Sequence, residues 1–303
     1  YQFVEANLQL ELLISQKETN SKVLELITVQ FRAGQAGIAD VLQQRQLVES
    51  NKGDMAALRA EIYLLQHRLA ILLGTHPGAK AFSSPERLPD LAPLPFTGIP
   101  MDLLAKRPDI RASYLQLKAA DNRVAAAVAN RLPRITISAD LTTGGESAGD
   151  LFNNWISSLA GGLFGPIIDG GQRKGEVARS EAIAEQQFYR HCQAILEAIG
   201  EVEDALVQEK EQLVILDSQK YQLQLAAETI EHVANRYRQG GEDYQRVLLA
   251  LLSHQALQRS LITSQRRLLN IRIALYRALS GQIPQTSLSI GKEGLSIDTL
   301  PAE

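Results

Sequence analysis

The sequence has little of what proteins use for covalent cross-linking, metal chemistry or base stacking. It has one cysteine, Cys192, which excludes an internal disulfide and a multi-cysteine zinc site. Aromatic residues make up only 5%, with one tryptophan, and the net charge is −3, which argues against a nucleic-acid partner. The five histidines form no HxxxH or HExxH pair. We therefore expect no enzyme, no cofactor and no metal site.

Long apolar runs and an ordinary start are also lacking. No stretch of 18 apolar residues occurs, so the sequence predicts no transmembrane helix. The chain opens on Tyr1, without a methionine or a leader segment, and its first residues already have helical spacing. We therefore expect the chain to be truncated at its N-terminus.

What is present is mostly helical periodicity. Apolar residues at helical spacing predict a helical hairpin over residues 1–74, broken at the sequence FRAG of 31–34. Six of the eleven prolines fall within 75–100, which predicts an extended connector. A second helical region is expected from 101, with a helix that ends before Pro133.

A change of period marks residues 133–169. Apolar Ile135, Ile137 and Leu141 alternate with polar residues, and a Gly-rich apolar run from Trp155 follows a polar loop. This pattern predicts a β-hairpin with one apolar face. On pattern alone, a hairpin packed on a soluble core is the more common case. The very long helices attached to it offer no soluble core of matching size, which favours a membrane barrel.

Two further helices are expected, over about 172–236 and 244–279, before a polar tail at 282–303. The first has a heptad seam at positions spaced by four and three residues: Phe188, Cys192, Ile195, Ile199, Val202 and Leu206, resumed at Leu213, Leu216, Leu223, Ala227 and Ile230.

The chain contains an internal repeat. The sequence FRAG at 31–34 matches YRQG at 237–240, and ILLG at 71–74 matches ALSG at 278–281. The residues of the matching breaks differ by about 206 positions, which indicates a duplicated helical hairpin. Residues 101–281 form the complete second repeat. By this symmetry, we expect that about 106 residues of the first repeat, with another helix and another β-hairpin, are missing from the start of the sequence.

Several short motifs stand out along the chain: LLAKRPDIR at 103–111 with LPRI at 132–135, FGPIIDGG at 164–171, EVEDAL at 201–206 and YRQG at 237–240. They resemble motifs of TolC-like outer-membrane efflux proteins, in particular the lipoprotein branch of the OprM/NodT type that serves RND pumps. No single motif is decisive, but their order, spacing and duplication make the resemblance specific.

This resemblance implies a mainly α-helical protein that forms a homotrimer in the outer membrane of a Gram-negative bacterium. Each full protomer would give two β-hairpins to a 12-stranded transmembrane β-barrel, and the helices would form a long periplasmic α-barrel with an equatorial connector. The implied function is passive export of drugs or other small molecules. The implied partners are a periplasmic adaptor protein, an inner-membrane RND pump and outer-membrane lipid.

The resemblance also implies a gate where the helices resume after each break, at 39–43 and 245–249. Asp40 matches a gate carboxylate of the family, and Arg246 lies in the matching segment of the second repeat. Leu249 stands where many members have aspartate, and Gln43 is its equivalent in the first repeat. A leucine ring would close by dewetting, whereas an aspartate ring would select cations.

Other residues leave two interpretations open. Glu242 and Asp243 directly precede the second segment and are further gate candidates. They and Asp40 also fit ordinary helix N-termini, where the dipole favours acids. Trp155 is a candidate anchor at the membrane interface or a packing residue.

Two other classes of protein share long helices. A periplasmic coiled-coil adaptor is the main alternative, although such proteins usually insert one helical hairpin into β-rich domains. A soluble signalling bundle is the second, and the β-hairpin argues against it.

Overall fold

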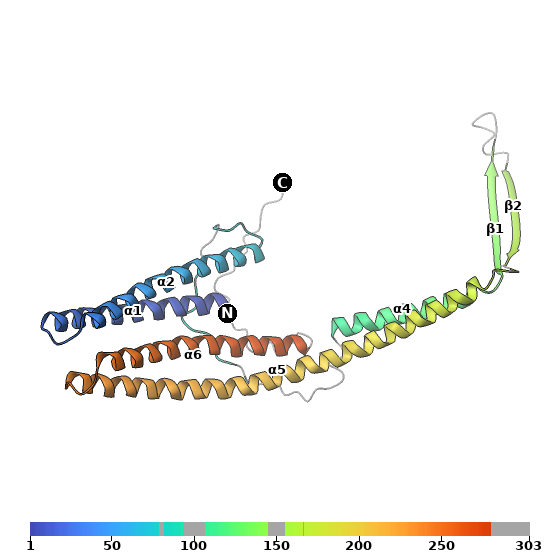
Figure 1. Ribbon diagram of the computed structural model, residues 1–303. Helices are drawn as coiled ribbons and strands as arrows, with labels where there is room; N and C mark the ends of the chain where they lie inside the picture. The colour runs from blue at the N-terminus through green and yellow to red at the C-terminus, as the bar shows by residue number, and fades with distance from the viewer. Residues whose placement is uncertain (79–81, 92, 94–106, 145–154, 166, 280–303) are drawn as a thin grey trace. The chain divides into compact units, whose positions relative to one another are not determined.

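The computed structural model describes residues 1–78, 82–91, 93, 107–144, 155–165 and 167–279 (Figure 1). The expected helix start near Met101, the tip of the hairpin loop and the tail at 282–303 lie outside the described residues, as does part of the connector at 75–100. Among the described helices, none has the length and apolarity required of a membrane span.

The chain divides into two compact units. One comprises residues 1–97 and 201–303, and the other comprises 98–200. The elements follow the chain as α1 (Gln2–Arg32), α2 (Ile38–Leu72), α4 (Pro108–Ala129), β1 (Arg134–Thr143), β2 (Trp155–Phe164), α5 (Gln172–Arg238) and α6 (Tyr244–Ala278). The later residues of α5 belong to the first unit and its earlier residues to the second.

The two matching break sequences form the same helix ending. After α1, the Gly34 N–H donates to the Phe31 carbonyl at 3.0 Å and the Gln35 N–H donates to the Gln30 carbonyl at 2.8 Å. After α5, Gly240 and Gly241 repeat this pair of bonds at 2.9 Å each. This is the Schellman motif, which needs a left-handed residue, and Gly34 and Gly240 have φ of 72° and 74°. The two helix breaks of the predicted repeat therefore have the same backbone structure.

Within the first unit, α1 lies beside α2, and α6 lies beside the later part of α5 (Figure 1). The buried positions of α5 keep heptad spacing: Val202, Ala205, Glu209, Gln212 and Leu216. The predicted spacing is therefore confirmed over 202–216, but its phase is wrong there for two of the leucines, and Phe188 and Ala227 of the predicted seam are exposed. Leu206 is only half-buried and Leu213 is 43% exposed. The seam instead uses small and polar residues, which an apolar pattern does not reveal.

Within the second unit, α4 packs against the earlier part of α5. Ile110 and Ala198 are buried together, with Ile195 and Ile199 against them. Pro108 takes the first helical position, where its missing N–H costs nothing. The preceding Arg107 is buried and binds the Asp109 carboxylate through two N–H groups, at 2.7 and 3.1 Å. This pairing lowers the pKa of the Asp109 carboxyl group.

The predicted β-hairpin is confirmed as an antiparallel pair in which Arg134 lies opposite Phe164 and Thr143 opposite Trp155. One face carries large aliphatic side chains from both strands, which are 65–79% exposed: Ile135, Ile137, Leu141, Leu159 and Leu163. The other face is mainly Thr, Ser, Gly and Asp, but Ile156 and Phe164 lie on it at the two ends of β2. No described element covers either face.

Candidate functional site

The two helix breaks lie against each other and share one hydrophobic cluster. Ile27 of α1, Val41 of α2, and Tyr244 and Leu248 of α6 are buried together, with Tyr237 of α5 packed against them. The rings of Tyr237 and Tyr244 are 6.0 Å apart and tilted by 60°. The duplicated segments therefore meet as a pair, and we call residues 31–43 and 237–249 together the break region.

A chain of buried hydrogen bonds leads away from this cluster. The Tyr244 hydroxyl donates to Gln44 Oε1 at 2.6 Å, and Gln44 Nε2 donates to the Asn20 carbonyl at 2.7 Å. The Asn20 and Gln255 side-chain amides then pair with each other at 3.0 and 3.3 Å. Each of these polar side chains is nearly inaccessible to solvent. Because unpaired buried amides are costly, this network fixes the register of α6 against α1 and α2.

The two tyrosines have raised pKa values. Burial is the main cause for Tyr244, and the nearby Asp40 carboxylate adds to it. Burial also raises the pKa of Tyr237, again with a contribution from Asp40, while its hydroxyl donates to Gln30 Oε1 at 2.8 Å. Both phenols therefore remain neutral hydrogen-bond donors at physiological pH.

The acidic candidates of the break region occupy two kinds of position. Asp40 is half-buried, and its carboxylate accepts the Gly37 N–H at 3.0 Å, which satisfies a free donor at the start of α2. Asp243 is the exposed N-cap residue of α6. Glu242 is 13% exposed and lies between two arginines, with Arg246 at 2.9 Å and Arg236 at 3.5 Å. The charge of Glu242 is therefore largely compensated within the chain.

Gln43 and Leu249 occupy equivalent positions in the two repeats, and the structure leaves both exposed. Leu249 is 59% exposed, although the preceding Leu248 is buried in the cluster. Gln43 is exposed beside buried Gln44. Both side chains are thus available to line a passage or to meet another chain, unlike the adjacent Gln44 and Leu248.

Sequence reasoning missed the buried polar residues of this region. Tyr237, Tyr244, Gln44, Asn20 and Gln255 were not among the candidates. A signal was available, because the buried positions of α1 include Leu13, Gln16, Asn20 and Ile27 at heptad-like spacing. A polar residue at such a position specifies register at some cost in stability.

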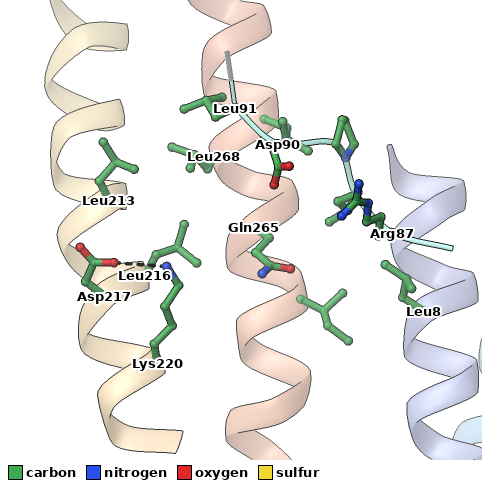
Figure 2. Close-up of a pocket in the computed structure, with 14 residues that line it drawn as sticks. Leu8, Arg87, Asp90, Leu91, Leu213, Leu216, Asp217, Lys220, Gln265 and Leu268 are labelled. Atoms are coloured by element: carbon green, nitrogen blue, oxygen red, sulfur yellow. Dashed lines mark hydrogen bonds and ion pairs between the residues drawn. The ribbon is translucent and has the colours of Figure 1, made fainter. Parts of the chain in front are cut away.

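A pocket of about 530 Å³ lies elsewhere in the first unit (Figure 2). Its walls come from α1, α5, α6 and the connector residues 87–91. Leucines dominate it, and Asp217 and Lys220 form an exposed ion pair at 3.3 Å along its wall. These groups suit packing of the connector on the helices rather than a reaction. Among the described residues, no three His, Cys, Asp or Glu side chains gather to hold a metal ion.

Trp155 begins β2 and lies on the same face as Leu159 and Leu163. Its side chain is about half exposed, beside the end of the hairpin that leads into its loop. This is the position that an aromatic residue at a membrane interface would take, so the anchor role stays a prediction.

Duplicated long helical hairpins that carry an uncovered, two-faced β-hairpin define a class of protein, the TolC-like channels. The sequence profile of the outer membrane efflux proteins matches residues 99–281. The chain belongs to this family, which places it in the outer membrane. Family membership favours the channel over the adaptor alternative.

The curated relatives include outer-membrane components of several exporters. Pyoverdine export outer membrane protein OpmQ of Pseudomonas aeruginosa is 31% identical over 261 residues, covering 86% of this chain and 55% of the relative. Toluene efflux pump outer membrane protein TtgI of Pseudomonas putida is 30% identical over 268 residues, covering 85% and 55%. Nodulation protein T of Rhizobium leguminosarum biovar trifolii is 29% identical over 263 residues, covering 84% and 56%. The chain thus spans about half the length of these relatives.

Solved structures share the fold. The outer-membrane channel OprN superposes with a TM-score of 0.85 at 26% identity, over 92% of this chain and 64% of that one. The outer membrane protein VceC of Vibrio cholerae has a TM-score of 0.80 at 24% identity, over 92% and 67%. The second likeness concerns the fold alone.

Proposed function

We propose that this chain is part of an outer-membrane channel subunit of a tripartite efflux system. In this proposal three protomers close their β-hairpins into one barrel in the outer membrane, and their helices form a periplasmic conduit. Substrate passes through without chemical change, after delivery by an inner-membrane RND pump through a periplasmic adaptor.

The uncovered apolar face of the hairpin is the observation that carries the proposal. Its five large aliphatic side chains are 65–79% exposed in the isolated chain. Burying each would stabilise the protein by about 2 kcal/mol, or roughly 10 kcal/mol for the face. A two-stranded ribbon is also marginal alone and leaves backbone groups unpaired at both edges. Closure into a lipid-embedded barrel would bury this face and pair both edges.

The break region supports a gate at the periplasmic entrance. Exposed Gln43 and Leu249 come from equivalent positions of the two repeats, so a trimer would present six such side chains in quasi-sixfold arrangement. We propose that Leu249 forms the apolar part of this constriction, while Asp40, Glu242, Asp243 and Arg246 surround it. Because Asp40 and Glu242 already have partners within the chain, they would shape the entrance more than they would bind the passing substrate.

The proposal assigns no single exported compound to the channel. The names of its relatives refer to pyoverdine, solvents, toluene and cations, which have little chemistry in common. A shared channel architecture therefore does not select one substrate, and we assign selection to the partner pump.

Channel activity of the full-length protein in planar lipid bilayers tests the proposal. We expect discrete single-channel conductance and a heat-sensitive trimer on gels. Leu249→Asp should alter conductance or cation selectivity by adding charge to the constriction, and Asp40→Ala should change conductance by loosening the start of α2. A monomeric protein without conductance would contradict the channel. Normal channels that neither substitution affects would contradict only the gate.

Trp155 provides an independent optical test of the membrane position. We expect blue-shifted fluorescence that lipid quenchers at the headgroup level reduce. Absence of quenching would remove the anchor role.

A further inference from the structure

The polar face of the hairpin carries two charged residues, one base at its start and one acid. Across the two strands, the ionisable residues are Arg134, at the first position of β1, and Asp140. Asp140 is exposed and lies opposite Ser158. At about 3.3 Å per residue, it lies roughly 20 Å along the strand from Arg134. The two charges are therefore too far apart to neutralise each other.

The register fixes the face on which Asp140 lies. Side chains alternate along a strand, so Asp140 shares its face with Ser138 and Thr142, while Ala139 and Leu141 take the other. The Thr136 hydroxyl donates to the Gly162 carbonyl at 3.3 Å within the same polar row. A slip of β1 by one residue against β2 would put the carboxylate on the face of Leu159 and Leu163, where lipid would make it costly.

We propose that Asp140 lines the water-filled interior of the barrel and makes the open pore favour cations. This inference rests on the proposed channel function. In a trimer the carboxylate would occur three times at one level of the barrel. A ring of carboxylates raises the local cation concentration and repels anions, as charged rings do in other channels. This selectivity element is separate from the break region, because it sits in the strands.

The test is ion selectivity of the full-length protein in planar bilayers under a KCl gradient. The reversal potential gives the ratio of potassium to chloride permeability. We expect Asp140→Asn to lower this ratio by about twofold or more near 0.1 M salt, with a smaller difference near 1 M, because the Debye length shortens from about 10 Å to about 3 Å. Each variant is first checked for trimer assembly by heat-sensitive migration on gels.

Moving the charge provides matched controls. Ser138→Asp alone should raise the permeability ratio in an otherwise intact channel, and combined with Asp140→Asn it should restore the native ratio. Ala139→Asp combined with Asp140→Asn puts the same charge on the opposite face and should not restore it.

The outcomes separate the two proposals. If the native protein gives no channel, the proposed function fails. If it gives channels whose selectivity is unchanged by Asp140→Asn, the channel function stands and the role of Asp140 is refuted. If Asp140→Asn does not assemble, an unchanged ratio in Ser138→Asp is sufficient to refute it.

Discussion

Substitution of one partner in the ion pair between Glu209 and Arg272 should strongly lower the stability of the fold. It joins α5 to α6 through two short bonds of 2.6 and 2.7 Å, and the side chains are only 4% and 6% exposed. Arg272 also donates to the Pro93 carbonyl of the connector at 3.3 Å. Hydrogen bonding to Glu209 raises the pKa of Arg272, so the guanidinium stays charged at any pH at which the protein folds.

Glu209→Gln keeps the shape of the side chain but removes the charge that compensates Arg272. Breaking one partner of a buried pair costs about 3–5 kcal/mol, because the remaining charge stays buried without compensation. For a chain of 303 residues, that corresponds to a fall in Tm of roughly 5–8 °C, and to a smaller fall in a longer chain. Thermal unfolding of the full-length protein in detergent, followed by circular dichroism, measures this shift.

Two comparisons control the experiment. Glu49→Gln removes an acid from an exposed pair with Lys52 and should leave Tm nearly unchanged. Glu209→Leu combined with Arg272→Met removes both buried charges and should recover most of the lost stability. A Glu209→Gln variant as stable as the native protein would refute the reasoning, and so would a double variant less stable than the single one.

Three further predictions concern the first unit. Tyr244→Phe removes a buried hydrogen bond and should cost about 1–3 kcal/mol in unfolding experiments, whereas Tyr237→Phe, in a less buried place, should cost less; equal losses would contradict this. Gly34→Ala puts a side chain at φ of 72° and should cost about 1 kcal/mol of stability. Gly53→Ala, inside α2 with open space around it, should stabilise the protein by a similar amount. A Gly34→Ala variant that is not destabilised, or a Gly53→Ala variant that is not stabilised, would contradict this. Burial lowers the pKa of His254 below its ordinary 6.5. The stability that the neutral imidazole contributes is therefore fully present above pH 6.5 and is lost as pH falls through the lowered pKa. The drop in Tm between about pH 7.5 and about pH 5.5 should therefore be smaller in His254→Gln.

The sequence predicted the helix ends and the β-hairpin, because a few neighbouring residues determine these features. Glycines such as Gly34 and Gly240 end helices because they accept a left-handed conformation, and a two-residue period in 135–141 leaves little choice but a strand. Such signals are carried by a few neighbouring residues, so one sequence is enough to show them.

The sequence did not predict the buried polar contacts of the helical unit, because the residues that bind each other there are far apart in the chain. Asn20 and Gln255 are separated by 235 positions, and Glu209 and Arg272 by 63. In the sequence alone, each of these polar residues resembles an ordinary surface residue. The phase of the α5 seam was missed for the same reason, because Ala205, Glu209 and Gln212 occupy the buried positions while apolar spacing assigns the seam to Leu206 and Leu213.

The most direct test compares one charge at two neighbouring positions of β1. Ile137→Arg puts a cation on the apolar face and Ser138→Arg puts it on the polar face, in the full-length protein. A lipid-facing arginine near the bilayer midplane costs about 2–4 kcal/mol per protomer, whereas a water-facing one costs little. We predict that Ile137→Arg loses most of the heat-sensitive trimer recovered from outer membranes while Ser138→Arg retains it. Equal recovery of the two variants, or loss of Ser138→Arg alone, would contradict a hairpin embedded in lipid through its aliphatic face.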